Sequence, residues 1–141
     1  DFKPLINARL ETIDEKISFK KLIKLHRCVA VADGFYEWKR EEKNKTPHYF
    51  LREDKKNMYM AGIYENDEFC LITENASENV NIIHHRQPVI LNESDVNRYL
   101  NLELSGSNFL NECKKTKLSF YEVSKEVNKP TNNSISLIQK I

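Results

Sequence analysis

Apolar and polar residues alternate along several short segments of the chain, as expected for β-strands with one buried face. The segments with the clearest strand pattern are 28–32, 35–38, 47–51, 57–64, 69–73 and 118–123. The polar residues 52–56 separate the third of these from the fourth by a short turn, which predicts that the two form a β-hairpin. Residues 40–46 and 74–81 are mostly polar and are expected to be loops, and residues 1–12 are expected to be extended.

Helical spacing is limited to short segments. Directly after the N-cap candidate Ser18, the apolar Phe19, Leu22 and Ile23 are followed by His26 at the spacing i, i+3, i+4 and i+7, which places the four on one face of a short helix. Ser94 and Ser107 are further N-cap candidates, each followed by a few apolar residues at helical spacing. Strands scattered among short helices, without regular alternation of the two, predict a single α+β domain over residues 1–141. We expect a mostly antiparallel, barrel-like β-sheet with a few short peripheral helices.

Composition excludes several classes of protein. No apolar run approaches the roughly 20 residues that a membrane span needs, and no signal-like segment follows Asp1, so no membrane partner is expected. The three cysteines lack CxxC spacing, which argues against a disulfide framework or a zinc ribbon and favours a reducing compartment. Three glycines are too few for a glycine-rich phosphate loop. The net charge of +1 neither demands nor excludes a nucleic-acid partner.

Two segments carry candidate chemistry. His84, His85 and Arg86 precede Pro88, which favours an ordered turn that leads into a strand. Histidine transfers protons near neutral pH and arginine holds anions, although a surface turn with solvated histidines would look the same. Glu37 lies in a strand of aromatic residues, where burial would turn a carboxylate into a usable acid or base and exposure would leave it inert.

Other kinds of site find little support in the sequence. The adjacent histidines cannot easily chelate one ion, and no HExxH motif is present, so no metal or other cofactor is expected. No GxSxG motif indicates a serine nucleophile. Cys28 follows Arg27, which could lower the pKa of its thiol, but a cysteine in a small apolar strand is more often a buried structural residue.

Four segments together resemble one protein family. In order, they are LINARLET (5–12), RCVAVADGFYEW (27–38), MAGIYE (60–65) and IHHRQPVIL (83–91). This order is similar to that of the SRAP family, the SOS response-associated peptidases, also called abasic-site processing proteins. The closing segment 123–128 also resembles the end of that family's domain. The resemblance implies the SRAP fold, an α+β domain with a basic groove for single-stranded DNA.

The resemblance also implies a reaction and its residues. In this family an N-terminal cysteine reacts with the aldehyde of an abasic site and closes a thiazolidine, a covalent DNA–protein crosslink, and an autopeptidase activity accompanies it. By position, Asn7 would orient that cysteine, and Glu37 would assist proton transfer in Schiff-base formation. His84 would protonate the sugar oxygen, open the ring and assist reversal. Arg9 and Arg86 would contact DNA phosphates.

The chain departs from the family at its start. The family's leading Met-Cys-Gly-Arg segment is absent, the chain begins at Asp1, and none of its cysteines is N-terminal. We therefore expect an SRAP domain without that segment, inactive in crosslinking by itself and prone to self-association through open strand edges. The alternatives are a catalytically silent module that binds single-stranded DNA, and a thiol peptidase. Replication-fork proteins are candidate partners, and the expected location is the cytoplasm at the nucleoid in a bacterium or the nucleus in a eukaryote.

Overall fold

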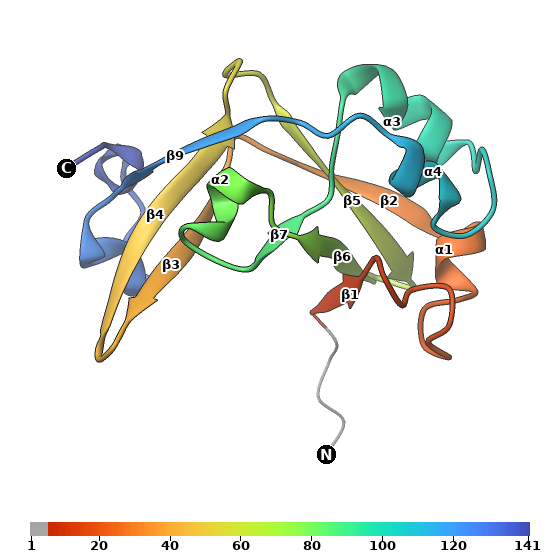
Figure 1. The fold of residues 1–141 in the computed structure, drawn as a ribbon, viewed down its shortest axis with the longest axis horizontal. Coiled ribbons are helices and arrows are strands. Elements are labelled where there is room, and N and C mark those ends of the chain that lie inside the picture. The colour runs from red at the N-terminus through yellow and green to blue at the C-terminus, as the bar shows by residue number, and fades with distance from the viewer. Residues whose placement is uncertain (1–5) are drawn as a thin grey trace.

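Nine strands, four short α-helices and two 3-10 helices make up residues 6–141, the part of the chain that the computed structural model describes (Figure 1). The strands are β1 (Asn7–Arg9), β2 (Arg27–Ala32), β3 (Phe35–Glu41), β4 (Asn44–Arg52), β5 (Met58–Glu65), β6 (Glu68–Asn75), β7 (Arg86–Pro88), β8 (Ile90–Leu91) and β9 (Leu118–Glu122). The α-helices are α1 (Leu22–Leu25), α2 (Glu78–Asn81), α3 (Glu93–Leu100) and α4 (Asn108–Glu112). The 3-10 helices are Lys125–Asn128 and Ile135–Ile138. The predicted α+β class is confirmed.

The strands form two sheets rather than one. The larger sheet has the order β1-β6-β5-β2, with β7 paired to β6 and β8 paired to β5. The smaller sheet has the order β3-β4-β9. All pairs are antiparallel except β1 with β6, so the sheet is mostly antiparallel as predicted. Within residues 6–141 the two sheets remain open at their edges and do not close into a barrel.

The predicted hairpin of 47–51 with 57–64 is wrong. Strand β4 pairs with β3 and β9, whereas β5 pairs with β2, β6 and β8 in the other sheet. The hairpin partner of β4 is β3, and the predicted loop 40–46 is in fact mostly strand. Only Glu42 and Lys43 turn the chain, with φ of 49° at Glu42, as a tight two-residue hairpin turn requires.

Strand β5 explains why the sheets separate, because both of its faces are buried. Met58 and Met60 pack into a core shared with Phe50 of the smaller sheet. Ala61 and Ile63 point to the opposite face, into a second core. That second core also contains apolar residues from the three helices gathered at one end of the molecule, namely Ile23, Tyr99, Phe109 and Leu110 (Figure 1).

The predicted helices are present but shorter or shifted. Only α1 is helical within 19–26, and turns precede it. Helix α3 begins after Asn92 rather than Ser94, whereas α4 begins after Ser107 as predicted. The expected loop 74–81 contains α2, and the expected extended segment 1–12 contains β1, although its residues 1–5 lie outside the described part. None of the helices among residues 6–141 has the length and apolarity needed to cross a membrane.

Candidate functional site

One cleft of about 550 Å³ contains all five residues that the sequence singled out for catalysis or DNA binding. These residues are Asn7, Arg9, Glu37, His84 and Arg86. The cleft lies where β1, β3 and β7 approach one another, and it is also lined by Phe35, Tyr36, Met60, Leu71, Thr73, His85, Gln87 and Pro88. The fold therefore brings residues that lie far apart in the sequence, such as Asn7 and Arg86, to one cavity.

The larger sheet positions three of the five, Asn7 and Arg9 on β1 and Arg86 on β7, while His84 lies in the segment between α2 and β7. On β1, the exposed Asn7 and Arg9 flank the buried Ala8, so strand alternation sends both polar side chains to one face. Strand β1 pairs with β6 in parallel, and β7 pairs with β6 in the antiparallel direction, both reaching Thr73. Thr73 pairs with Arg9 on one side and with Pro88 on the other, so β6 lies between the Arg9 strand and the Arg86 strand.

Glu37 comes from the smaller sheet and meets His84 across the cleft. The Nε2 atom of His84 lies 3.8 Å from Oε1 of Glu37, and the two side chains are 26% and 28% exposed. The same Glu37 oxygen accepts a hydrogen bond from the Trp38 backbone N–H at 3.2 Å. A carboxylate and an imidazole thus face each other in a half-buried setting, as acid–base chemistry requires.

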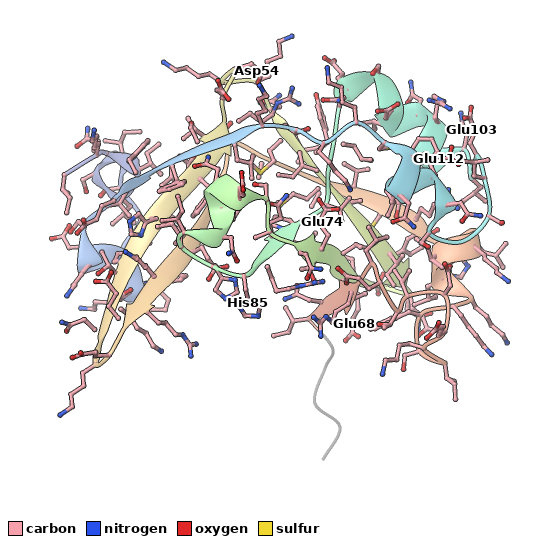
Figure 2. All side chains as sticks on the ribbon, viewed as in Figure 1. Asp54, Glu68, Glu74, His85, Glu103 and Glu112 are labelled. Atoms are coloured by element: carbon pink, nitrogen blue, oxygen red, sulfur yellow. The ribbon has the colours of Figure 1, made fainter. Side chains whose placement is uncertain are left out.

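The other ring nitrogen of His84 is held by the backbone two residues further on. Nδ1 lies 3.1 Å from the Arg86 backbone nitrogen and 3.2 Å from the Arg86 carbonyl oxygen. A neutral ring can accept the Arg86 N–H at Nδ1, and a protonated ring can donate to the Arg86 carbonyl. His84 therefore has a backbone partner in both protonation states. The exposed His85 ring stacks on His84 at 4.6 Å between centroids and lies at the lower edge of the molecule (Figure 2).

The two predicted phosphate ligands differ in their surroundings. Arg9 is exposed and forms no ion pair with any residue in the described part of the chain. The Arg86 guanidinium, in contrast, is bound through both terminal nitrogens to the Glu11 carboxylate, at 2.9 Å each. These hydrogen bonds lower the pKa of Glu11 to about 2. Phosphate binding by either arginine stays a prediction. Arg86 already pairs with a carboxylate, whereas Arg9 has no ion pair within residues 6–141.

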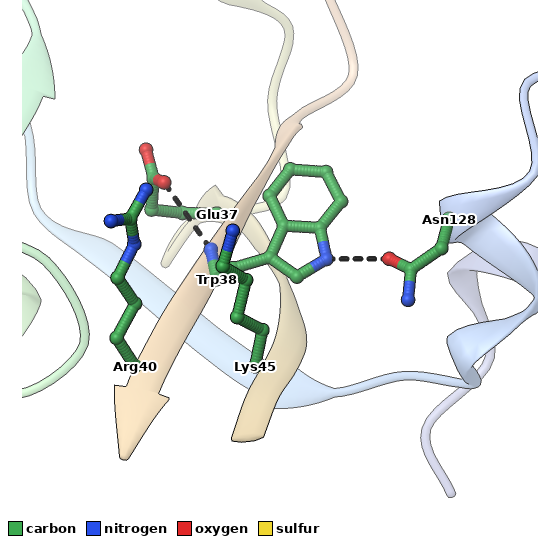
Figure 3. A pocket seen from close by; sticks show the side chains of 5 residues that line it. All are labelled: Glu37, Trp38, Arg40, Lys45 and Asn128. Carbon is green, nitrogen blue, oxygen red and sulfur yellow. Dashed lines mark hydrogen bonds between the residues drawn. The ribbon is translucent and has the colours of Figure 1, made fainter. Parts of the chain in front are cut away.

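Sequence reasoning missed two cations beside the cleft. A neighbouring hollow of about 330 Å³ shares Glu37 and is also lined by Trp38, Arg40, Lys45 and Asn128 (Figure 3). Arg40 and Lys45 are directly opposite each other in the β3–β4 pair. Like charges in that position are unfavourable unless an anion lies between them. The sequence predicts a loop over residues 40–46, which gives Arg40 and Lys45 no fixed relation. The hairpin register, set by the turn at Glu42 and Lys43, is what places them opposite each other.

Within the described part of the chain, no thiol lines the cleft. Cys28 and Cys70 lie on β2 and β6, and burial raises the pKa of both thiols. Burial also raises the pKa of Cys113, to about 11. The raised pKa of Cys28 agrees with the structural reading of that residue rather than with a nucleophile. Among residues 6–141, no cluster of three or more His, Cys, Asp or Glu side chains is arranged to hold a metal ion.

Comparison with known sequences places the chain among a defined group of proteins. The family described as "SOS response associated peptidase (SRAP)" matches residues 2–130. The chain is 36% identical over 149 residues to the abasic site processing protein YoqW of Bacillus subtilis, covering 96% of this chain and 66% of YoqW. It is 30% identical over 154 residues to the abasic site processing protein YedK of Escherichia coli, covering 100% of this chain and 69% of YedK.

The fold is similar to that of a solved structure. A crystal structure of a protein from Bacteroides thetaiotaomicron superposes with a TM-score of 0.83 at 30% identity, covering 96% of this chain and 65% of that one. The chain thus spans about two thirds of the length of YoqW and YedK, at 66% and 69%. Because the family match extends over most of the sequence, and the fold agrees, the chain belongs to the SOS response associated peptidase (SRAP) family.

Proposed function

We propose that this chain is the DNA-processing domain of an abasic-site processing protein, which acts on abasic sites in single-stranded DNA. The observation that supports this most strongly is the convergence of Asn7, Arg9, Glu37, His84 and Arg86 on one cleft. Relatives at 30–36% identity carry the name abasic site processing protein. Such a role would place the protein at the nucleoid of a bacterium or in the nucleus of a eukaryote, near replication-fork proteins.

The Glu37–His84 pair would carry the proton transfers. Opening the deoxyribose ring requires a proton at the ring oxygen, and forming an imine requires protons to move between amine, hydroxyl and carbonyl. His84 would supply the first proton and Glu37 would shuttle the others. Their separation of 3.8 Å and half-buried state support this assignment, because a group that is partly shielded from water still exchanges protons with it.

Recognition would rest on the DNA backbone, because an abasic site offers no base to read. Arg9 would bind one phosphate at the cleft, and Arg86 would face another. The opposed pair of Arg40 and Lys45 would bind a neighbouring phosphate beyond Glu37. The cleft of about 550 Å³ has room for a deoxyribose.

The covalent step belongs to the same proposal. An N-terminal cysteine would close a thiazolidine with the abasic aldehyde, Asn7 would orient it, and the same group would serve autopeptidase activity. Among residues 6–141, the cleft offers candidate acid–base groups and candidate DNA contacts, and no cysteine lines it.

The second candidate is a module that binds single-stranded DNA without reacting, for which the cations at and beside the cleft, Arg9, Arg40 and Lys45, would suffice. A thiol peptidase is less well supported, because burial raises the pKa of the thiols of Cys28, Cys70 and Cys113 and so reduces their nucleophilic form.

The test compares binding with crosslinking. Fluorescence anisotropy should show that the chain binds single-stranded DNA with one abasic site several-fold more tightly than the intact strand. His84→Ala should reduce that preference, and Glu65→Gln, at an exposed glutamate outside the cleft, should leave it unchanged. Equal binding of both DNAs would contradict the proposed function and favour the module that binds single-stranded DNA without reacting.

A denaturing gel then tests the chemistry. The chain should run beside YoqW after incubation with abasic DNA. A heat-stable shifted band for YoqW alone agrees with an N-terminal nucleophile. A band for this chain as well would place a nucleophile within its 141 residues.

A further inference from the structure

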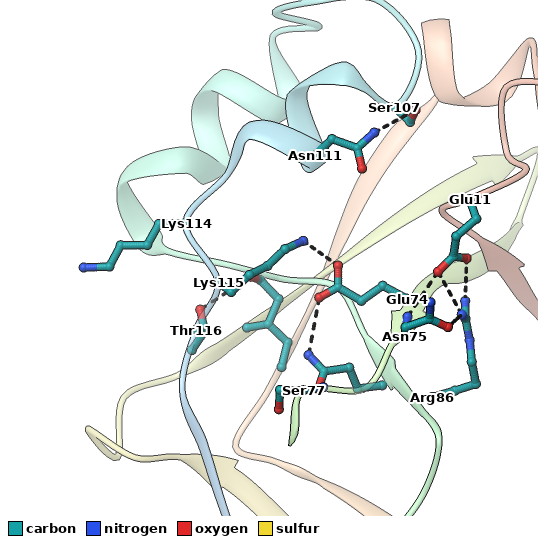
Figure 4. A network of polar contacts seen from close by, with 12 residues as sticks. Glu11, Glu74, Asn75, Ser77, Arg86, Ser107, Asn111, Lys114, Lys115 and Thr116 are labelled. Atoms are coloured by element: carbon teal, nitrogen blue, oxygen red, sulfur yellow. Dashed lines mark hydrogen bonds and ion pairs between the residues drawn. The ribbon is translucent and has the colours of Figure 1, made fainter. Parts of the chain in front are cut away.

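The carboxylate of Glu11 joins three strands next to the cleft, without lining the cleft itself (Figure 4). It lies just after β1 and accepts a hydrogen bond from the Asn75 backbone N–H on β6, at 3.1 Å. It also accepts hydrogen bonds from both terminal nitrogens of Arg86 on β7, at 2.9 Å each. A two-pronged bond between carboxylate and guanidinium fixes orientation as well as distance.

The remaining terminal N–H groups of Arg86 are bound as well. Nη1 donates to the Asn75 side-chain oxygen at 2.8 Å, and Nη2 donates to the Thr73 hydroxyl at 3.0 Å. The Arg86 side chain is only 12% exposed, while that of Glu11 is 40% exposed. Four hydrogen bonds from one guanidinium leave Arg86 with little freedom to rotate.

The backbone of this same arginine holds His84. Its N–H and carbonyl both lie within 3.2 Å of Nδ1 of His84. When the ring is neutral and Nδ1 accepts that N–H, the ring proton must be on Nε2, the nitrogen that faces Glu37. The tautomer of His84 thus depends on the position of the Arg86 backbone relative to Nδ1.

We propose that Glu11 is a positioning residue for His84: by clamping Arg86 between β1, β6 and β7, it keeps the His84 proton on the nitrogen that faces Glu37. This inference rests on the proposed function only for its catalytic meaning, because the tautomer can be measured without any reaction. It gives Arg86 a task besides phosphate binding. The pKa of Glu11, lowered to about 2 mainly by the Arg86 hydrogen bonds, shows that the clamp stays charged at neutral pH.

The experiment is a nitrogen-15 NMR measurement of the histidine rings in the full 141-residue chain, at a pH where His84 is neutral. The wild type should show Nδ1 unprotonated and Nε2 protonated. Glu11→Gln keeps the size of the side chain but replaces one acceptor oxygen with an amide NH₂ that repels Arg86. The ratio of the Nε2-protonated to the Nδ1-protonated form of His84 should fall about fivefold, which corresponds to the loss of about one hydrogen bond that orients the ring. Glu15→Gln, at an exposed glutamate four residues away, should leave it unchanged.

Two further variants keep the test decisive. Thr73→Val removes one acceptor of Arg86 with little change of shape, and it should shift the ratio in the same direction by a smaller factor. Arg86→Gln should shift the ratio strongly, and adding Glu11→Gln to it should have no further effect, because both act through one clamp. An unchanged His84 spectrum in folded Glu11→Gln, or additive effects in the double variant, would overturn the proposal. Equal binding of abasic and intact DNA by the wild type would count against the proposed function alone.

Discussion

Replacing Arg27 by methionine should destabilise the fold more than any exposed charge substitution. This side chain is only 5% exposed and donates hydrogen bonds at 2.6 to 3.3 Å to five backbone carbonyls. The acceptors are the carbonyls of Ile23, Tyr99, Glu103, Leu104 and Gly106. The guanidinium also lies over the Tyr99 ring, at 5.1 Å. It therefore joins the end of α1 to the segment between α3 and α4.

The magnitude follows from which carbonyls lose their partner. The hydrogen bonds to Ile23, Tyr99 and Gly106 are buried, whereas water can replace those to Glu103 and Leu104. A buried polar group left without a partner costs about 1–3 kcal/mol, and local relaxation recovers part of the sum. We expect a loss of about 4 kcal/mol. An unfolding entropy of about 0.3 kcal/mol/K for 141 residues converts this into a fall in Tm of roughly 13 °C.

The assay is urea unfolding followed by circular dichroism, with a thermal melt beside it. Arg98→Met is the matched control, because Arg98 is 55% exposed and pairs with Asp95 and Glu103 near the same segment. It should cost less than about 1 kcal/mol, as exposed ion pairs do. Arg27→Lys should fall between the two, since an ammonium cannot reach all five carbonyls. If Arg27→Met cost no more than Arg98→Met, the five hydrogen bonds would not stabilise the fold as argued.

Three further outcomes follow from other parts of the structure. Gly106→Ala should cost about 2 kcal/mol in urea unfolding, because φ is +57° and a Cβ would collide with the Asp14 carboxylate; a neutral result would refute the strain. The folded-state pKa of Glu11 is lowered, so its stabilising effect is complete above the ordinary value of 4.5 and is lost as pH falls toward about 2. After allowance for its 40% exposure this amounts to about 1 kcal/mol, and it should vanish from the stability–pH curve of Glu11→Gln. Arg9→Gln should reduce the salt dependence of single-stranded DNA binding by about 0.7 in log–log slope, and an unchanged slope would exclude a phosphate contact.

The site residues could be named from the sequence because the segments that resemble the SRAP family contain them. These segments hold the Asn-Ala-Arg triplet, the glutamate among aromatic residues and the His-His-Arg turn. Asn7, Glu37 and His84 all line one cleft, while their roles remain predictions. The strand locations were also predictable, because alternation follows from one buried face.

Strand pairing was not predictable, because a turn is recognised from neighbouring residues whereas the pairing of strands depends on contacts between residues far apart in the sequence. The polar residues 52–56 look like a hairpin turn, yet they connect strands of different sheets. What decides the outcome is that β5 buries Met58 and Met60 on one face and Ala61 and Ile63 on the other. A strand buried on both faces belongs in the middle of the fold, and β4, which pairs with β3 and β9, covers one of its sides.

Glu37 lies on the smaller sheet and His84 lies just before β7 of the larger sheet, so the distance between them depends on how the two sheets pack. Glu37 belongs to the smaller sheet, His84 follows the helix α2, and the core containing Phe50 and Met58 lies between the sheets. A small relative shift of the two layers would change the 3.8 Å separation before any strand came apart. The sizes of the core side chains Phe50 and Met58 therefore set the distance between Glu37 and His84, although neither Phe50 nor Met58 lines the cleft.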